Sequence, residues 1–334
     1  MTTGNRARLG AIALLGAILV SSGCGRTYEI PVGEPSFSPD GEKLIFSHCE
    51  AGKCDLVTYE LRTGAIRRFP SRDDENWRLP RYSADGQKIA FSAGRPGSDF
   101  RQIAIMNSDG TAYRPLTKGD AWRAAPSFSP DGRRVIYVRA GHIRTEGVNR
   151  IVDRDIYEVD VETGNEKRLT SFEFFQTSQP SYLPDGRRFI FSGDGPGVTP
   201  KLELHKRLQA QYQDNQIYIL AGDEKELRPA FTNGSDSGSP DISADGTRIL
   251  FRSRTNEMDG KSGRFNFDIF IRESETNRRI TNLETFLWYA ALSPDGSKIV
   301  FLDDKDRNRK QKLWLMNVDG TGLTELRIPL PVMR

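Results

Sequence analysis

Residues 126–137 read PSFSPDGRRVIY, a pattern typical of a strand, a tight turn and a second strand. Asp131 and Gly132 form the turn, because glycine accepts a positive φ that other residues resist. The β-branched and aromatic residues from Val135 to Tyr137 favour a pleated, half-buried surface. This stretch alone therefore predicts one β-hairpin.

The same phrase recurs along most of the chain. Six copies end in an Asp-Gly pair, and successive turn glycines are 45, 46, 54, 60 and 50 residues apart: Gly41, Gly86, Gly132, Gly186, Gly246 and Gly296. A period of that size is typical of propellers, solenoids and arrays, and four predicted strands per repeat select the propeller. The predicted fold is therefore all-β, a six-bladed β-propeller of four-stranded antiparallel blades.

Composition and length limit the class of protein, the partners and the segments that we expect. The chain has 334 residues, 28% of them charged and 37% hydrophobic, with a formal net charge of +3. This near balance of charge gives no electrostatic reason to bind nucleic acid. We expect four segments: a signal peptide at 1–23, an anchor or linker at 24–33, the propeller at 34–328 and a tail at 329–334. Residues 27–32 should approach residues 323–328, because propellers commonly close the ring with strands from both chain ends.

The first residues are typical of an export signal. Two arginines precede an apolar run at residues 9–20, which is too short to span a bilayer comfortably. The run leads to SSGC at residues 21–24, which resembles the lipobox of bacterial lipoproteins. That resemblance implies a diacylated Cys24, and Gly25 after it implies outer-membrane rather than inner-membrane anchoring. Ser21 departs from the usual leucine, so secretion with an unmodified Cys24 is the alternative.

Two cysteines remain after Cys24. Cys49 and Cys54 flank a predicted hairpin tip, a geometry that brings two Cβ atoms within disulfide range in an exported protein. A metal site that also uses His48 is the alternative, although three close ligands without a fourth are a weak signal. We expect the disulfide.

The repeat resembles that of a known family. The phrase P-x-F-S-P-D-G-x-x-I-x-F, followed by I-x-x-x-N-x-D-G-x-x-x-x-L-T, is similar to the repeat of the periplasmic protein TolB and its WD40-like propeller relatives, over about residues 34–328. This signature describes a fold and names no activity. The larger prolyl-oligopeptidase-like relatives add an α/β-hydrolase domain, which we do not expect here because few residues follow the sixth repeat.

No catalytic constellation is visible in the sequence. The aspartate of each Asp-Gly pair is expected to cap its own turn. The three histidines, His48, His142 and His205, are expected in surface loops. We therefore expect no cofactor, no metal ion and no enzymatic activity.

The two faces of the predicted ring differ. Short turns share one face, the turn face, whereas the longer connections share the other, the loop-rich face, with insertions at residues 139–154, 193–215 and 252–266. The loop-rich face also carries three aromatic pairs: Trp77-Arg78, Trp122-Arg123 and Trp288-Tyr289. Aromatic and arginine side chains suit a binding hot spot. Tryptophans that fill gaps between blades are an equal alternative.

These features predict an exported, lipid-anchored, monomeric scaffold at the periplasmic side of the cell envelope. Its loop-rich face would bind a protein partner or an extracytoplasmic ligand. The competing class is a propeller enzyme acting on polysaccharide, a lyase or hydrolase, which needs histidine, arginine and carboxylates clustered on that face. Arg78, Arg123 and Arg144 are present in the sequence without a histidine in the same loops.

Overall fold

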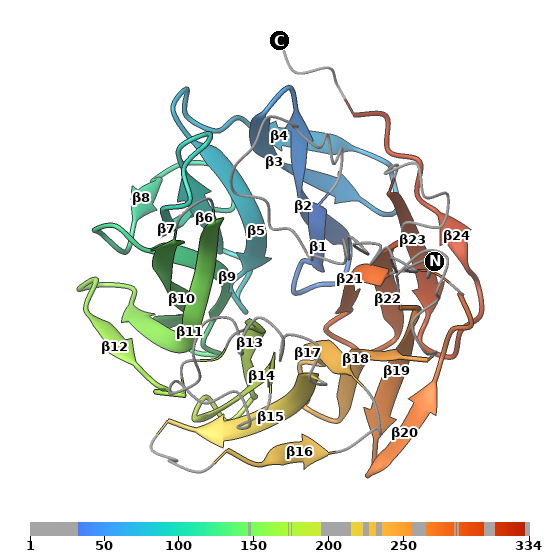
Figure 1. The fold of residues 1–334 in the computed structure, drawn as a ribbon. Coiled ribbons are helices and arrows are strands. Elements are labelled where there is room, and N and C mark those ends of the chain that lie inside the picture. Colours follow the sequence, from blue (N-terminus) through green and yellow to red (C-terminus); the bar gives the residue numbers. More distant parts are fainter. Residues whose placement is uncertain are drawn as a thin grey trace, which may run out of the picture.

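Six four-stranded antiparallel sheets form blades around one axis in the computed structural model (Figure 1). The structure describes residues 33–145, 148–172, 174, 176–194, 215–222, 227–231, 236–255, 265–283, 285, 287–303 and 311–330. The predicted signal peptide, Cys24 and His205 lie outside these residues, as does most of the insertions at 193–215 and 252–266. The predicted all-β, six-bladed propeller is confirmed.

The strands follow one another in chain order within each blade. Blades 1 and 2 consist of β1 (Gly33–Phe37), β2 (Lys43–Glu50), β3 (Lys53–Glu60), β4 (Ile66–Phe69), β5 (Asn76–Tyr82), β6 (Lys88–Gly94), β7 (Arg101–Asn107) and β8 (Arg114–Pro115). Blades 3 and 4 consist of β9 (Trp122–Phe128), β10 (Arg134–Thr145), β11 (Val148–Asp160), β12 (Glu166–Arg168), β13 (Thr177–Tyr182), β14 (Arg188–Asp194), β15 (Asn215–Ala221) and β16 (Pro229–Phe231). Blades 5 and 6 consist of β17 (Ser237–Ile242), β18 (Arg248–Arg254), β19 (Phe267–Glu273), β20 (Thr276–Arg279), β21 (Leu287–Leu292), β22 (Lys298–Asp303), β23 (Lys312–Asn317) and β24 (Thr324–Glu325).

The Asp-Gly turns are closed by their own side chains. In blade 3 the carboxylate of Asp131 accepts hydrogen bonds from the Ser129 hydroxyl at 2.5 Å and from the Arg133 amide at 3.1 Å. Gly132 adopts the positive φ of 68° that the turn requires. The hydrogen bond from Ser129, followed by that from Arg133, lowers the pKa of Asp131. The aspartates therefore cap turns, as the sequence predicted.

The hydrophobic core lies between the blades. Leu44 and Phe46 on β2 pack against blade 6, whereas Ile45 between them packs against blade 2. This alternation follows from the two-residue period of a strand, and it explains why the second strands are hydrophobic on both faces. Each blade is therefore held by its two neighbours rather than by a core of its own.

The first strands meet around the axis and complete the ring. Each contacts the first strand of the neighbouring blades, and β21 contacts β1. Blades 1 and 6 are each built from consecutive strands of the described chain. After β24, Leu326, Ile328 and Leu330 pack on the cluster between blades 6 and 1. The C-terminal segment thus supports the closure, while residues 27–32, predicted to take part, lie outside the described residues.

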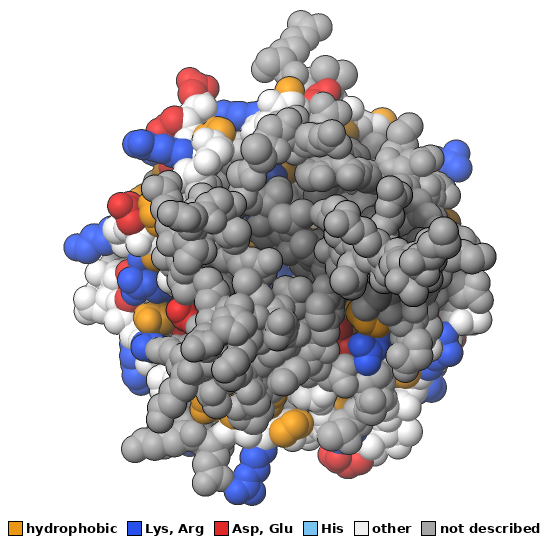
Figure 2. All heavy atoms as spheres, viewed as in Figure 1, with side chains coloured by type: hydrophobic (Ala, Val, Ile, Leu, Met, Phe, Trp, Pro, Cys, Tyr) orange, Lys and Arg blue, Asp and Glu red, His pale blue; other side chains and the backbone are white. Residues whose placement is uncertain are grey.

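The described surface carries charges of both signs. Figure 2 shows Lys and Arg side chains interspersed with Asp and Glu around the rim of the ring. Within the part of the chain that the structure describes, no helix has the length and apolarity needed to cross a bilayer.

Candidate binding site at the propeller axis

The residue before the leading proline bends each inner strand. In blades 1 to 5 this residue has a φ between 51° and 57°: Glu34, Leu79, Ala125, Gln179 and Ser239. Strand pairing shifts register at the same place. Residues other than glycine seldom adopt such a φ, so five repetitions mark a constrained feature of the fold. The bulge brings four of these side chains, those before Ser239, to the axis.

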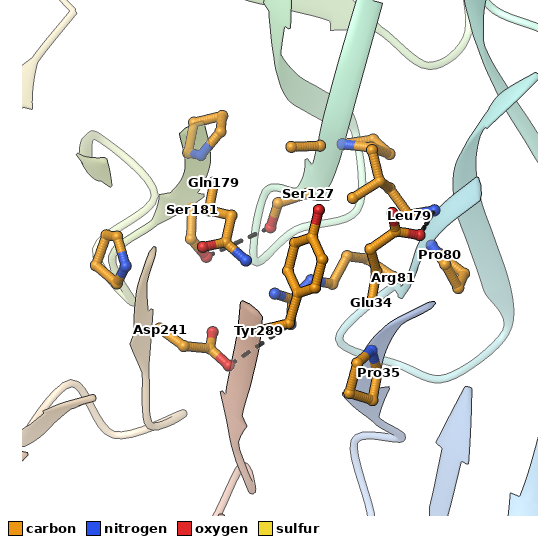
Figure 3. A pocket seen from close by; sticks show the side chains of 14 residues that line it. Glu34, Pro35, Leu79, Pro80, Arg81, Ser127, Gln179, Ser181, Asp241 and Tyr289 are labelled. Atoms are coloured by element: carbon orange, nitrogen blue, oxygen red, sulfur yellow. Dashed lines mark hydrogen bonds and ion pairs between the residues drawn. The ribbon is translucent and has the colours of Figure 1, made fainter. Parts of the chain in front are cut away.

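The bulges surround a small axial pocket. Its volume is about 30 Å³, and the inner strands of all six blades line it (Figure 3). Space of that size holds roughly two water molecules. A ligand larger than this cannot fit inside the pocket.

An ion pair crosses the axis. Arg81 on β5 and Asp241 on β17 belong to opposite blades, and their Nη1 and Oδ2 atoms are 3.5 Å apart. Asp241 is 8% exposed, and its Oδ2 also accepts a hydrogen bond of 2.9 Å from the Leu292 amide on β21. The pair therefore links three blades and fills the centre of the ring.

Two further polar side chains line the pocket. Glu34 accepts hydrogen bonds at its Oε2 atom from the Ser47 hydroxyl at 2.5 Å and from the Leu79 amide at 3.2 Å. Gln179 points into the pocket from blade 4, and its buried Oε1 atom accepts no hydrogen bond. Glu34 is thus held by blades 1 and 2, whereas Gln179 leaves an acceptor open at the axis.

Tyr289 stands in the middle of the pocket in Figure 3. Burial raises the pKa of its hydroxyl, and the negative charge of Glu34 raises it further. The positive charges of Arg252, Arg78 and Arg101 act in the opposite direction. Three guanidinium groups and one carboxylate therefore lie within electrostatic reach of this hydroxyl.

Trp77 is an interior residue. Its side chain is 5% exposed and packs on Phe91 and Tyr113, with ring centroids 4.8 Å and 5.3 Å apart. Its Nε1 atom donates a hydrogen bond of 2.8 Å to Glu75. Trp77 also belongs to the cluster between blades 1 and 2, so it fills a gap between blades.

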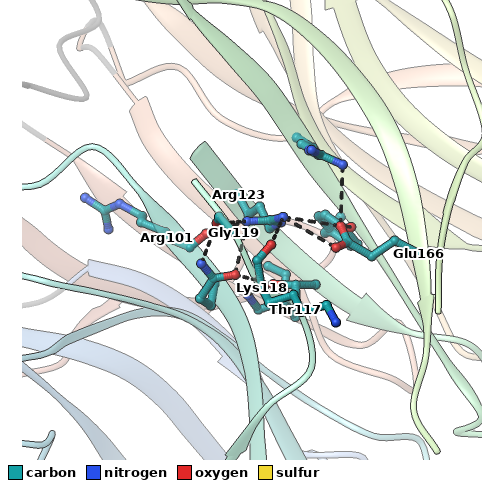
Figure 4. Close-up of polar contacts among 10 residues, drawn as sticks. Arg101, Thr117, Lys118, Gly119, Arg123 and Glu166 are labelled. Carbon is teal, nitrogen blue, oxygen red and sulfur yellow. Dashed lines mark hydrogen bonds and ion pairs between the residues drawn. The ribbon is translucent and has the colours of Figure 1, made fainter. Parts of the chain in front are cut away.

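Trp122 and Arg123 are also interior residues. Trp122 is 6% exposed in the cluster between blades 3 and 4. Arg123 is 1% exposed, and its guanidinium donates to the carbonyl oxygens of Lys118 at 2.7 Å and Gly119 at 3.1 Å (Figure 4). It also forms an ion pair of 3.4 Å with Glu166. Arg123 therefore joins blade 3 to the connection that precedes it.

The predicted hot spot on the loop-rich face needs a correction. Trp77, Trp122 and Arg123 are too buried to contact a partner, so the gap-filling alternative describes both tryptophans. Tyr289 is half-buried and lines the axial pocket, Arg78 is half-buried and its charge reaches Tyr289, and the side chain of Trp288 lies outside the described residues. Both buried tryptophans belong to inner strands, β5 and β9, and not to the connections in which they were predicted.

Sequence reasoning missed six residues of the axial site: Glu34, Arg81, Arg101, Gln179, Asp241 and Arg252. Four of them carried a usable signal, because Glu34, Arg81, Gln179 and Asp241 directly adjoin the leading proline of a repeat. Arg101 and Arg252 reach the site from other strands, and no repeat position in the sequence marks them.

Cys49 and Cys54 are joined by a disulfide at the tip of the β2–β3 hairpin. His48, the third residue of the alternative metal site, is 5% exposed. In the described ranges, no group of histidine, cysteine and carboxylate side chains is placed to hold a metal ion. The hairpin tip packs beside β5, because the Cys54 amide donates to Asn76 Oδ1 at 2.8 Å.

Comparison with known proteins supports the repeat assignment. Residues 27–192 match the family described as TolB beta propeller domain, PD40. The Tol-Pal system protein TolB of Francisella tularensis subsp. holarctica is 28% identical over 68% of this chain and 47% of its own length. The uncharacterized peptidase YuxL of Bacillus subtilis is 25% identical over 70% of this chain and 31% of its own length. The chain thus spans less than half of these relatives.

Solved structures share the fold. TolB from Acinetobacter baumannii superimposes with a TM-score of 0.60 at 21% identity, covering 86% of this chain and 61% of that one. Oligogalacturonate lyase in complex with manganese gives a TM-score of 0.56 at 16% identity, covering 87% of this chain and 75% of the lyase. Residues 27–192 therefore carry TolB-like PD40 repeats, in a chain that folds as a six-bladed β-propeller.

Proposed function

We propose that this TolB-like propeller is an exported, non-enzymatic scaffold that binds a protein partner on its loop-rich face. Cys24 would carry a lipid anchor and hold the monomeric propeller at the periplasmic side of the outer membrane. The matches to TolB support this placement, since one of these relatives is named as part of the Tol-Pal system.

One observation carries the proposal. The channel is filled at its centre by the ion pair between Arg81 and Asp241, which leaves a pocket of about 30 Å³. An extended substrate has no room inside it, so recognition takes place on the surface around the mouth. A rigid ring that presents connections on one face suits a binding scaffold.

The β10–β11 hairpin is the part of the loop-rich face best suited to contact a partner. The insertion predicted at residues 139–154 lengthens both strands, and pairing continues out to Thr145 and Val148. β10 and β11 have 12 and 13 residues, whereas the second and third strands of the other five blades have 6 to 8. The hairpin therefore extends beyond what the blade needs in order to fold.

The test is capture of the partner with and without this hairpin. In the truncated variant, Asn-Gly replaces residues 142–151, since Gly141 and Val152 face each other in the ladder and a two-residue turn can join them. Asp109→Ala on the turn face is the matched control. We expect the partner captured by the mature wild-type protein to be lost from the truncated variant alone. Equal capture by both variants, or loss from the control only, would place function elsewhere.

The lipid anchor has its own experiment. Cys24→Ser should move the protein from the membrane fraction to the soluble periplasmic fraction, because a diacyl chain is what retains it. Mass analysis of the wild-type N-terminus should show the lipid on Cys24. An unmodified Cys24 would favour the secreted form.

An enzymatic role is the second candidate. One relative is a peptidase and one structural neighbour is a lyase, so the same fold serves catalysis elsewhere. Purified chain should release no unsaturated product from oligogalacturonate and no product from peptide substrates, with or without manganese. Turnover that survives truncation of the hairpin and disappears in Tyr289→Phe would favour the enzyme.

A further inference from the structure

Two arginines whose charges reach Tyr289 at the axis have a buried Nε atom without an acceptor. Arg78 on β5 and Arg101 on β7 are half-buried, and the Nε atom of each is fully buried without a hydrogen-bond partner. Neither guanidinium forms a hydrogen bond or an ion pair with any described residue. A buried N–H donor without an acceptor costs free energy, so these two Nε atoms need an explanation in the structure or the function of the protein.

The backbone is shaped to bring Arg101 to this place. Arg101 pairs with Gly94 on β6, which separates β7 from the innermost strand β5. A Cβ atom at Gly94 would lie 2.8 Å from Arg101 Cγ, closer than real contacts allow. The side chain therefore crosses β6 where glycine leaves room, and its charge acts on both Arg78 and Tyr289.

The neighbouring carboxylates do not neutralise the pair. The charges of Glu34 and Asp99 reach Arg101, yet neither forms an ion pair with it. Glu34 is already engaged by the Ser47 hydroxyl and the Leu79 amide. These two acids repel an incoming anionic group, and they repel a doubly charged group more strongly than a singly charged one. The site therefore favours a carboxylate group, which carries one negative charge, over a phosphate group, which can carry two.

We propose that Arg78 and Arg101 bind one carboxylate group at the mouth of the axial channel. The guanidinium fork matches a planar carboxylate, which can accept from both arginines at once. Tyr289 can donate its hydroxyl proton to the same group. Resting on the proposed function, this site would hold an acidic side chain of the protein partner.

The test uses a small dicarboxylate and therefore needs no partner. Glutarate is titrated against the mature protein, and its dissociation constant is taken from the rise in melting temperature. Neutral glutaramide and inorganic phosphate are the comparison ligands at constant ionic strength. Arg78→Gln and Arg101→Gln are each expected to weaken glutarate binding roughly tenfold, because each removes one charge-assisted contact.

Two further variants separate charge from geometry. Arg187→Gln, an exposed arginine on the turn face, should bind glutarate like the wild type. Arg101→Lys keeps the charge but loses the fork, so its affinity should fall between those of the wild type and Arg101→Gln.

Glutarate binding no tighter than glutaramide binding would overturn the site. Equal weakening of glutarate binding in Arg187→Gln would also overturn the site. Phosphate binding tighter than glutarate binding would overturn the assignment of the ligand as a carboxylate. Partner capture that persists when glutarate binding fails would leave the scaffold function standing without this site. Glutarate binding by a protein that captures no partner would support the carboxylate site and contradict the scaffold function.

Discussion

The same dipeptide, Trp-Arg, introduces blades 2 and 3, yet the two copies lie in different environments. Trp77 stands three residues before the leading proline of its strand, and Trp122 stands four before its own. In the ladders, Trp77 pairs with Ala93 and Arg123 pairs with Arg139, each seven residues after the turn glycine. Arg123 thus occupies the position of Trp77.

A shift of one residue moves every side chain of a strand to its other face. Trp77 accordingly packs toward the preceding blade, and Trp122 packs toward the following one. Arg123 enters the interface with blade 2, where it binds the carbonyl oxygens of the chain, while Arg78 stays at the axis without an acceptor. The position of each arginine relative to the leading proline, rather than its residue type, therefore decides whether its side chain stabilises the fold.

The largest expected effect is on the tryptophans. Trp77→Ala and Trp122→Ala should each lower the free energy of unfolding by about 3–5 kcal/mol, because a large buried ring is replaced by a cavity. Denaturant unfolding at neutral pH measures this. A loss below about 1 kcal/mol in either variant would mean that this tryptophan is exposed at the surface and not buried between blades.

The arginines give the sharper contrast. Arg123→Met should cost about 3 kcal/mol, because it leaves the carbonyl oxygens of Lys118 and Gly119 and the carboxylate of Glu166 without this donor. Arg78→Met should change stability by less than about 0.5 kcal/mol, or raise it, because its guanidinium has no hydrogen bond or ion pair with a described residue to lose. Equal losses in the two variants would mean that the shift in register has no energetic consequence.

The disulfide stabilises the region around Trp77 and not the region around Trp122. The hairpin tip it closes is bound to Asn76, the residue before Trp77. Replacing Cys49 and Cys54 by serine should lower stability by about 2 kcal/mol, since the closed loop is short. Mass analysis of non-reduced protein should show one internal bond and no free thiol at these positions. Two alkylatable thiols would contradict the bond.

The fold could be predicted from the sequence because each repeat contains the residues that form its turn. The Ser129–Asp131–Gly132 turn could be predicted residue by residue, since its hydrogen bonds are local. The axial site could be predicted only in part. Asp241 and Arg81 meet across the ring although 160 residues separate them, and no local pattern encodes that pairing. The tryptophans were ambiguous because burial depends on a register that the turn glycine alone does not reveal.

The smallest expected effect is on alkaline stability, and it distinguishes the two dipeptides once more. Tyr113 stacks on Trp77 and donates to Glu75, while Tyr137 donates to Glu166, the partner of Arg123. Burial, and then the hydrogen bond to the carboxylate, raises the pKa of each tyrosine.

A raised pKa means that the folded state keeps a proton that the unfolded state loses. The stability from each tyrosine is therefore complete below about pH 10, the unfolded pKa, and declines as pH rises toward the folded value. Tyr137→Phe should flatten the fall in stability above pH 10 by up to about 1.4 kcal/mol per pH unit. Tyr113→Phe should give the same flattening just above about pH 10 but over a narrower pH range, because the pKa of the half-buried Tyr113 is raised less than that of Tyr137. Unfolding by urea between pH 9 and 11, values chosen around the roughly pH 10 of free tyrosine, measures both slopes. An unchanged slope in Tyr137→Phe would contradict the raised pKa of Tyr137 and its hydrogen bond to Glu166.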